Sequence, residues 1–319
     1  MPALTTHCLY GEKIALNCNC DYLTKVINKY KQLYYIGCQG PDLLFFYHKI
    51  PYLQSNGKEV NKIGSLMHHE NINELFTSLL SQTYQSKDDR MIAYLCGFIA
   101  HHCLDSQAHP YIFYRTGSAK VNTGYKHVSF EGEIDGAILD HFKIGRDEFR
   151  CDKLIKHNKK DREVISTMLS KAIKDSTGKD VGKKVIADCC KDLIMIEKML
   201  YDPKGKKSVF LTKLENKLNA PGLATSMLIT MKYDDKLDCL NYRHDSWSNP
   251  CDNTMITNKD FLQMGQDAVD IGVKIFKSIE KYLDGQIDIS EVINQINNRS
   301  FETGLPTKET MKYFAYDLQ

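Results

Sequence analysis

Apolar residues recur at intervals of three and four along most of the chain, a spacing that gathers them on one face of a helix. In the segment 21–34, for example, Leu23 and Ile27 share such a face. The pattern predicts helices at about 21–34, 71–84, 88–105, 129–142, 161–174, 181–201, 259–283 and 289–298. Alternating strand patterns are scarce, with short candidates at 111–114 and 208–211. We therefore expect an all-α fold built of many helices.

One segment interrupts the helical pattern. Glycine, proline, asparagine and aspartate are concentrated at 234–258, so this segment is the best candidate for a long loop or a domain boundary. We find no internal repeat and no low-complexity segment in the rest of the chain. The sequence therefore predicts a single helical domain over residues 1–319, with a C-terminal helical part from about residue 146 onward.

The composition is that of a globular protein with a neutral charge balance. The 319 residues are 42% hydrophobic and 26% charged, and the net charge is +2. This balance gives no overall attraction to nucleic acid or to an anionic membrane. Basic stretches at 153–160 and 204–207 are interpreted as solvated helix faces and loops.

The sequence also predicts a cytoplasmic location. The longest apolar run, 91–100, is about half of the ~20 residues that a membrane-spanning helix needs. The first residues lack the basic start and the apolar run of a secretory signal. The 11 cysteines form no regular framework, so we expect reduced thiols rather than structural disulfides.

The histidines are concentrated at one end, since eight of the 11 lie within the first 127 residues. His101, Asp105 and His109 are each four residues apart, which places them in one stripe on a helix. The apolar run before them would bury this stripe, and one divalent cation could satisfy all three buried groups. The alternative is a hydrogen-bonded polar stripe on a partly exposed helix. Pro110 predicts that the helix ends or bends at His109, turning that side chain away from the other two.

A second pair has the same spacing. His127 and Glu131 are four residues apart at the start of the next predicted helix. Alone, such a pair is usually a surface pair, but it follows the first stripe by only eighteen residues. The two helices together supply five ligands, which is more than one four-coordinate zinc can use.

Further candidates lie upstream, and each alone is more often structural than catalytic. Asp42 is a polar residue in the otherwise apolar stretch 40–47, where it could bind metal or cap a helix. His68 and His69 precede another predicted helix, and His7 lies near the start of the first one.

Together these residues resemble the zinc-dependent phospholipase C family, which is similar in architecture to the fungal and plant single-strand zinc nucleases. The segments that carry the resemblance stand in the family's order: Thr6-His7, Gly40-Pro41-Asp42, Met67-His68, Gly97 through His101 and Asp105 to His109-Pro110-Tyr111, and His127 with Glu131. The resemblance covers about residues 2–145, the expected metal-binding core, and the segment 247–250 with the following helix is similar to the family's C-terminal part. It implies an all-helical fold with three zinc ions at the bottom of a cleft.

The resemblance also implies three ligand sets. One zinc would be bound by Asp42, His68, His101 and Asp105, and a second by His109, His127 and Glu131. The third would be bound by His7, a shared Asp105, and the amine and carbonyl of the first residue, which is Pro2 once the initiating methionine is removed. His68 is preferred over His69 as the ligand because Met67, directly before it, and Glu70, two places after it, fit the family pattern.

The implied chemistry is hydrolysis of a phosphodiester by metal-activated water, with two or three zinc ions as cofactors. Asp42 would bind metal and orient or deprotonate the water. The positive charge of the ions exceeds the negative charge of the ligand carboxylates. This surplus favours an anionic phosphoester as the substrate, with a phospholipid as one candidate. A nuclease or a phosphomonoesterase is the alternative among enzymes, with nucleic acid less favoured. Outside enzymes, the alternative is a non-catalytic helical protein that binds metal for stability or binds a partner.

Overall fold

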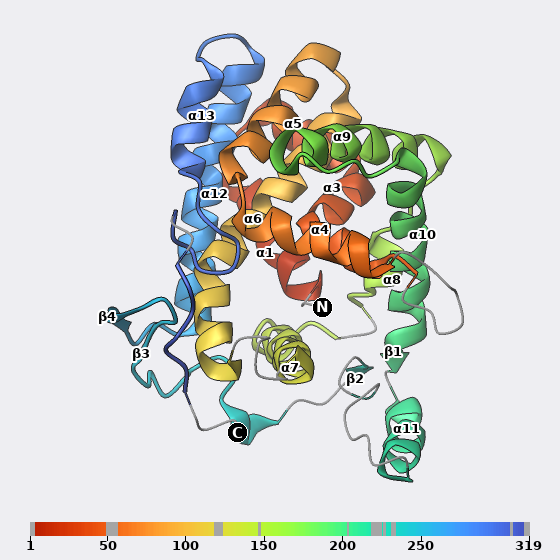
Figure 1. Ribbon diagram of the computed structural model, residues 1–319, viewed down its shortest axis with the longest axis vertical. Helices are drawn as coiled ribbons and strands as arrows, with labels where there is room; N and C mark the ends of the chain where they lie inside the picture. The colour runs from red at the N-terminus through yellow and green to blue at the C-terminus, as the bar shows by residue number, and fades with distance from the viewer. Residues whose placement is uncertain are drawn as a thin grey trace.

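The computed structural model describes residues 4–48, 57–117, 124–145, 148–202, 204–217, 225, 228–230, 234–306 and 309–315. Within these ranges the chain is mostly helical (Figure 1). The helices are α1 (Leu4–Asn17), α2 (Asp21–Lys29), α3 (Lys31–Gly37), η1 (Gly40–Phe46), α4 (Gly57–His69), α5 (Ile72–Ser86), α6 (Asp89–Thr116), α7 (Gly124–His141), α8 (Cys151–Leu154), α9 (Lys159–Thr177), α10 (Lys183–Leu200), α11 (Lys206–Lys217), η4 (Asp235–Leu237), α12 (Phe261–Leu283) and α13 (Ile289–Ile296). The predicted all-α fold is confirmed.

The strands are short and form two separate pairs. β1 (Tyr201–Asp202) pairs in parallel with β2 (Ile229–Thr230), and β3 (Trp247–Asn249) pairs antiparallel with β4 (Asp252–Thr257). The predicted loop at 234–258 therefore contains a small hairpin and the 3-10 helix η4.

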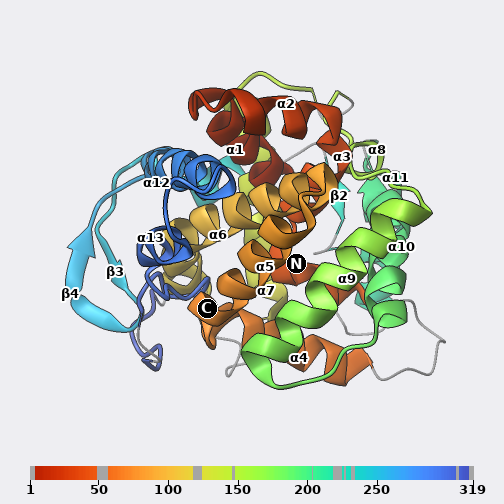
Figure 2. The same ribbon diagram turned by 90° about the horizontal axis from the view of Figure 1, so that it is seen from above.

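Helix α6 is the central element of the fold, with α12 and α13 on one side and α9 and α10 on the other (Figure 2). Asp88 caps its N-terminus, because the Asp88 side chain accepts a hydrogen bond from the backbone N–H of Arg90. Its middle is almost entirely buried, because α1, α2, α3, α5 and α12 pack around it. Gly97 permits α3 to approach closely, since a β-carbon there would lie 2.0 Å from the carbonyl oxygen of Tyr34.

Two predictions near α6 differ from the structure. The helix was predicted to end or bend at His109, but it does not end there and continues through Pro110 to Thr116. Proline removes only one backbone donor, and the residues that follow, such as Tyr111 and Ile112, are buried against the core. Packing therefore outweighs the lost hydrogen bond, and the strand candidate at 111–114 is helical.

The other differences are local. The predicted helix at 21–34 is two helices, α2 and α3, because the backbone leaves helical geometry at Tyr30, with φ −121° and ψ 42°. The strand candidate at 208–211 lies within α11. One hydrophobic core extends from Leu4 to Phe301, which supports our proposal of a single helical domain. Among the described residues, no helix combines the length and apolar composition needed to cross a bilayer.

Candidate metal centre

Histidine and carboxylate side chains from five helices meet beside α6. They are the predicted ligands His7 on α1, Asp42 on η1, His68 on α4, His101, Asp105 and His109 on α6, and His127 and Glu131 on α7. All but His127 are buried. The remaining candidate, Pro2, lies outside the described residues. Three subsets have ligand atoms within 4.8 Å of one another, close enough to share a metal ion.

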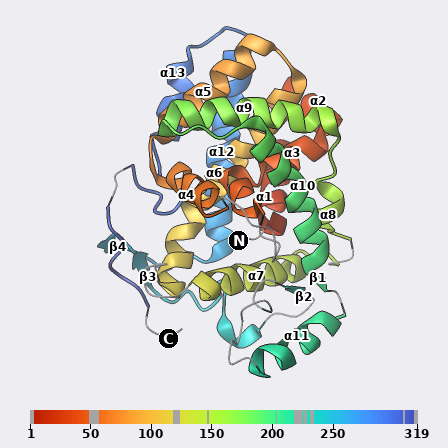
Figure 3. The same ribbon diagram turned by 45° about the vertical axis from the view of Figure 1, so that its right-hand side comes forward.

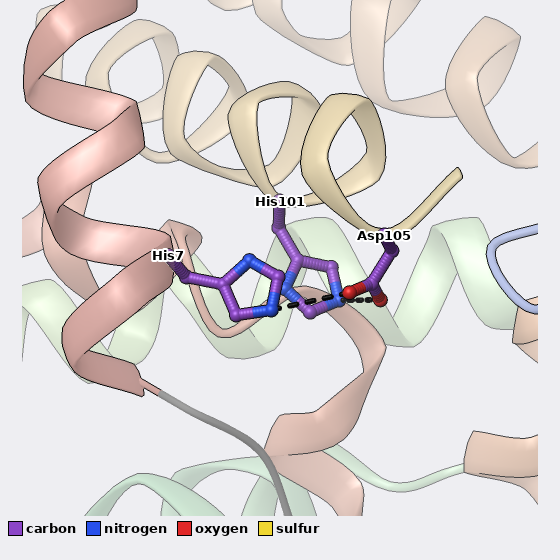
Figure 4. A group of neighbouring side chains, drawn as sticks. All are labelled: His7, His101 and Asp105. Atoms are coloured by element: carbon purple, nitrogen blue, oxygen red, sulfur yellow. Dashed lines mark ion pairs between the residues drawn. The ribbon is translucent and has the colours of Figure 1, made fainter. Parts of the chain in front are cut away.

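The first subset joins α1 to α6 and consists of His7, His101 and Asp105 (Figure 4). The carboxylate of Asp105 contacts both rings, with Oδ1 3.1 Å from Nε2 of His7 and Oδ2 2.9 Å from Nε2 of His101. Ligand atoms of one tetrahedral zinc lie roughly 3.3 Å apart, given metal–ligand bonds of about 2.0 Å. The contacts of Asp105 therefore have the spacing of neighbouring ligands.

The second subset consists of Asp42, His68 and His101, so His101 belongs to both groups. Oδ1 of Asp42 lies 3.1 Å from Nε2 of His68. Oδ2 of the same carboxylate is buried and has no hydrogen-bond partner among the described residues. A buried carboxylate oxygen without a donor is costly, and a bound cation would remove that cost.

The third subset consists of His109, His127 and Glu131. Oε1 of Glu131 lies 3.2 Å from Nε2 of His109 and 3.0 Å from Nε2 of His127. Nδ1 of His109 is also 3.5 Å from Oδ2 of Asp105, so the third subset adjoins the first. His127 is the most exposed of the eight side chains, at 19%, and marks where the centre is open to solvent.

Backbone carbonyls orient three of the histidine rings. Nδ1 of His68 lies 2.7 Å from the oxygen of Gly64, that of His101 lies 3.0 Å from the oxygen of Cys38, and that of His109 lies 3.0 Å from the oxygen of Phe301. A carbonyl can only accept, so each Nδ1 carries the proton. In a neutral ring, Nε2 then presents its lone pair to the carboxylates, as a metal-binding histidine does.

This arrangement fits a cation. Burial lowers the pKa of His101, so the ring is neutral at neutral pH. With its proton on Nδ1, the ring places an Nε2 lone pair 2.9 Å from Oδ2 of Asp105, which is also an acceptor. Two acceptors in contact repel each other unless a positive charge lies between them. The donor set, imidazole nitrogen and carboxylate oxygen, is one that zinc prefers.

The carboxylates are ionised. Burial alone would raise the pKa of Asp105, but its electrostatic interactions with His101, His109 and His7 outweigh burial and hold that pKa well below its usual range. Burial alone would also raise the pKa of Asp42, but the hydrogen bond from His68 outweighs burial. The pKa of Asp42 is therefore lowered. For Glu131 the charge of His127 and the hydrogen bonds from the histidines outweigh burial and lower the pKa. All three are therefore available as anionic ligands.

The grouping differs in detail from the predicted ligand sets. Asp105 was expected to bind one zinc with Asp42, His68 and His101 and to share another with His7. Its closest contacts are indeed His101 and His7, but it is not part of the subset formed by Asp42, His68 and His101. His69 lies outside the three subsets, and its Nδ1 is 3.9 Å from Oε2 of Glu302. The choice of His68 over His69 therefore agrees with the geometry.

Two features of the centre were missed in the sequence. Gly40 has φ +53°, and a β-carbon there would lie 2.1 Å from Cδ2 of His101, so only glycine lets the backbone approach this ring. The segment 300–301 binds the end of α4, since Phe301 N and Ser300 Oγ donate to the carbonyl of His68. Gly40 stands directly before Pro41 and Asp42, which was a usable signal; nothing in the sequence pointed to Phe301.

The fold and the centre define a helical protein with grouped histidine and carboxylate ligands. The chain matches the sequence model of the family described as zinc dependent phospholipase C over residues 6–197, more than half of its length. It therefore belongs to the zinc-dependent phospholipase C family, which implies a hydrolase that depends on zinc. Comparisons with curated proteins and with solved structures gave no match.

Proposed function

We propose that this protein hydrolyses a phosphodiester bond of a phospholipid, using two or three zinc ions bound by the three subsets. The observation that carries the proposal is the contact between two buried acceptors, Nε2 of His101 and Oδ2 of Asp105, at 2.9 Å. Family membership supports zinc as the cation and a phosphoester as the substrate.

Each subset would have a part in holding the ions. Asp105 would serve adjacent ions, because its two oxygens contact different histidines, whereas His101 would bind one ion through Nε2. Zinc bound there would supply positive charge that polarises a phosphoryl oxygen and lowers the pKa of water. Pro2 remains a proposed ligand of a third ion.

Asp42 is the proposed catalytic residue. Its lowered pKa keeps it ionised at neutral pH. Oδ1 contacts His68, which leaves Oδ2 to accept a hydrogen bond from a water molecule. This hydrogen bond would orient the water so that the lone pair of the water oxygen points at phosphorus. His127, as the most exposed member, lies where a substrate headgroup would enter.

A cytoplasmic location is also proposed. All 11 cysteines are buried free thiols, which is the usual state in a reducing compartment.

Two neighbouring histidines give a matched test. His68→Ala removes a member of the centre, whereas His69→Ala removes a side chain just outside it. We expect two or three zinc ions per wild-type chain by mass spectrometry, and release of phosphorylated headgroup from phosphatidylcholine. The first variant should lose about one zinc and about 10–100-fold in activity, the range that loss of a metal's supporting residue typically costs. The second variant should keep both its zinc content and its activity.

The remaining outcomes separate the alternatives. Zinc that is bound with no hydrolysis of any phosphoester would favour a non-catalytic metal-binding protein. Cleavage of single-stranded DNA in preference to phospholipid would identify a nuclease. Little zinc in the wild type, unchanged in His68→Ala, would refute the metal centre.

A further inference from the structure

Helix α11 exposes its apolar side chains. Val209 is 60% exposed, Phe210 67% and Leu214 43%. Phe210 and Leu214 are four residues apart and so lie on one face of the helix. A helix of a globular protein normally turns such a face to the core. Helix α11 lies at one end of the molecule, beyond α10 (Figures 1 and 3).

The opposite side of α11 is attached to the protein by polar contacts. Glu215 is buried, and its carboxylate accepts hydrogen bonds from the backbone N–H and hydroxyl of Thr225 at 2.8 and 2.6 Å. The backbone N–H of Ser208 donates to Asp202 at 2.7 Å. The amphipathic order is therefore inverted, with the polar side inward and the apolar side outward.

The outward face is also basic. Lys206, Lys207, Lys213 and Lys217 are all exposed, while the single acidic residue of α11, Glu215, is turned inward. Lys207 donates to the carbonyl of Met199 on α10, and Met199 is itself 51% exposed. The apolar surface thus continues onto α10 and is surrounded by positive charge that no acid of α11 offsets.

We propose that α11 is a docking helix that binds the surface of an anionic phospholipid membrane. A face that combines apolar side chains with lysines suits the boundary between lipid headgroups and acyl chains. A protein partner would need acidic groups matched to each lysine, whereas an anionic bilayer supplies negative charge everywhere. The proposal rests on the proposed phospholipid substrate, because docking there would hold the metal centre at its substrate.

The position of α11 agrees with this use. Helix α7, which carries His127, lies at the same end of the molecule as α11 in both Figure 1 and Figure 3. His127 is where the centre is open to solvent. A membrane bound by α11 would therefore lie at the end of the molecule that also carries α7.

Vesicle binding tests the proposal with the full-length protein. We would measure cosedimentation with vesicles of phosphatidylcholine alone and of phosphatidylcholine mixed with phosphatidylserine. We expect binding mainly to the mixed vesicles. The double variant Phe210→Ser/Leu214→Ser should bind them about ten-fold more weakly, because it loses apolar burial. The triple variant Lys206→Gln/Lys213→Gln/Lys217→Gln should lose on the order of 100-fold, since each lysine contributes about five-fold.

Matched controls change equally exposed residues elsewhere. Leu16→Ser on α1 controls for lost apolar surface, since Leu16 is 76% exposed. Lys25→Gln/Lys58→Gln/Lys179→Gln controls for lost charge, because these three lysines are also exposed. Both controls should bind mixed vesicles like the wild type, and all variants should keep the wild-type rate on a soluble phosphodiester, bis(p-nitrophenyl) phosphate.

The outcomes separate docking from catalysis. Equal binding by the wild type and the α11 variants would overturn the docking proposal, even if phospholipid is hydrolysed. A wild type that dimerises through α11, with no affinity for vesicles, would also overturn it. Vesicle binding that depends on α11, without hydrolysis of either substrate, would support docking and refute the proposed function alone.

Discussion

Asp135 accepts two hydrogen bonds from Thr6, one from its backbone N–H at 2.8 Å and one from its hydroxyl at 2.5 Å. Thr6 directly precedes His7, and Asp135 lies one helical turn after Glu131 on α7. Helix α7 thus contributes ligands to the third subset and also holds the start of α1, which carries a ligand of the first. The contact links two groups of the metal centre through the backbone.

Replacement of Asp135 should weaken the centre without removing a ligand. Asp135→Ala leaves two donors of Thr6 without their acceptor, so we expect a loss of about 1.5–3 kcal/mol in the free energy of unfolding. Bound zinc should also fall, because His7 is held less firmly. Thermal unfolding and metal analysis measure both effects.

Thr6→Val provides the graded comparison, because it keeps the backbone hydrogen bond and removes only that of the hydroxyl. It should cost about 1 kcal/mol. Unchanged stability and zinc content in Asp135→Ala would show that the contact has no role in positioning His7.

Gly40→Ala should displace the ring of His101 from its position in the centre. The backbone at Gly40 has φ +53°, which costs an alanine about 1–2 kcal/mol. The added β-carbon would also displace the His101 ring, which then loses its hydrogen bond to Cys38. We expect a total loss of about 2–4 kcal/mol in the free energy of unfolding, from strain and overpacking, and reduced zinc binding.

Gly132→Ala is the matched control on α7, where a β-carbon would meet no atom within 4 Å. Alanine is the better helix former, so this variant should be more stable by up to about 1 kcal/mol. If both substitutions had the same small effect, the close approach of Gly40 to His101 would carry no energetic weight.

The metal-free protein should lose stability as the pH rises above about 6.5. Burial opposes protonation, but the carboxylate partners outweigh it and raise the pKa of His68 to about 9 and that of His109 to about 10. A raised folded-state pKa stabilises the protein fully below the unfolded value of about 6.5. That contribution is lost as the pH rises through the folded values, at about 1.4 kcal/mol per unit of difference.

Denaturant unfolding of chelator-treated protein, from about pH 6 to about pH 10, measures this decline. Zinc competes with protons for the same ring nitrogens, so the zinc-loaded protein should not share it. Equal declines in both forms would mean that the histidines of the centre do not bind the metal.

Local spacing in the sequence predicted the helices and part of the candidate site. The four-residue steps from His101 to Asp105 and from His127 to Glu131 became contacts of 2.9 and 3.0 Å, because both pairs lie on helices. The spacing could not show which subset each residue joins, since that depends on how α1, α4 and α7 pack around α6.

Tertiary packing explains most of what the sequence did not reveal. Pro110 predicted the end of a helix, but burial of the following turn keeps α6 intact. The lysines at 204–207 were interpreted as a solvated loop and helix face. In the structure Glu215 is turned inward, so the outer face of α11 is both apolar and basic. This face could not be predicted from the sequence.

The carbonyl of Phe301 fixes the ring of His109, although 192 residues separate them in the chain. The family match covers residues 6–197, so His109 lies within the matched range and Phe301 lies outside it. During synthesis, the ligands from the first half of the chain leave the ribosome long before Phe301 does. Full assembly of the centre must therefore wait until residue 301 has been synthesised, which would delay tight zinc uptake and any hydrolysis by the nascent chain.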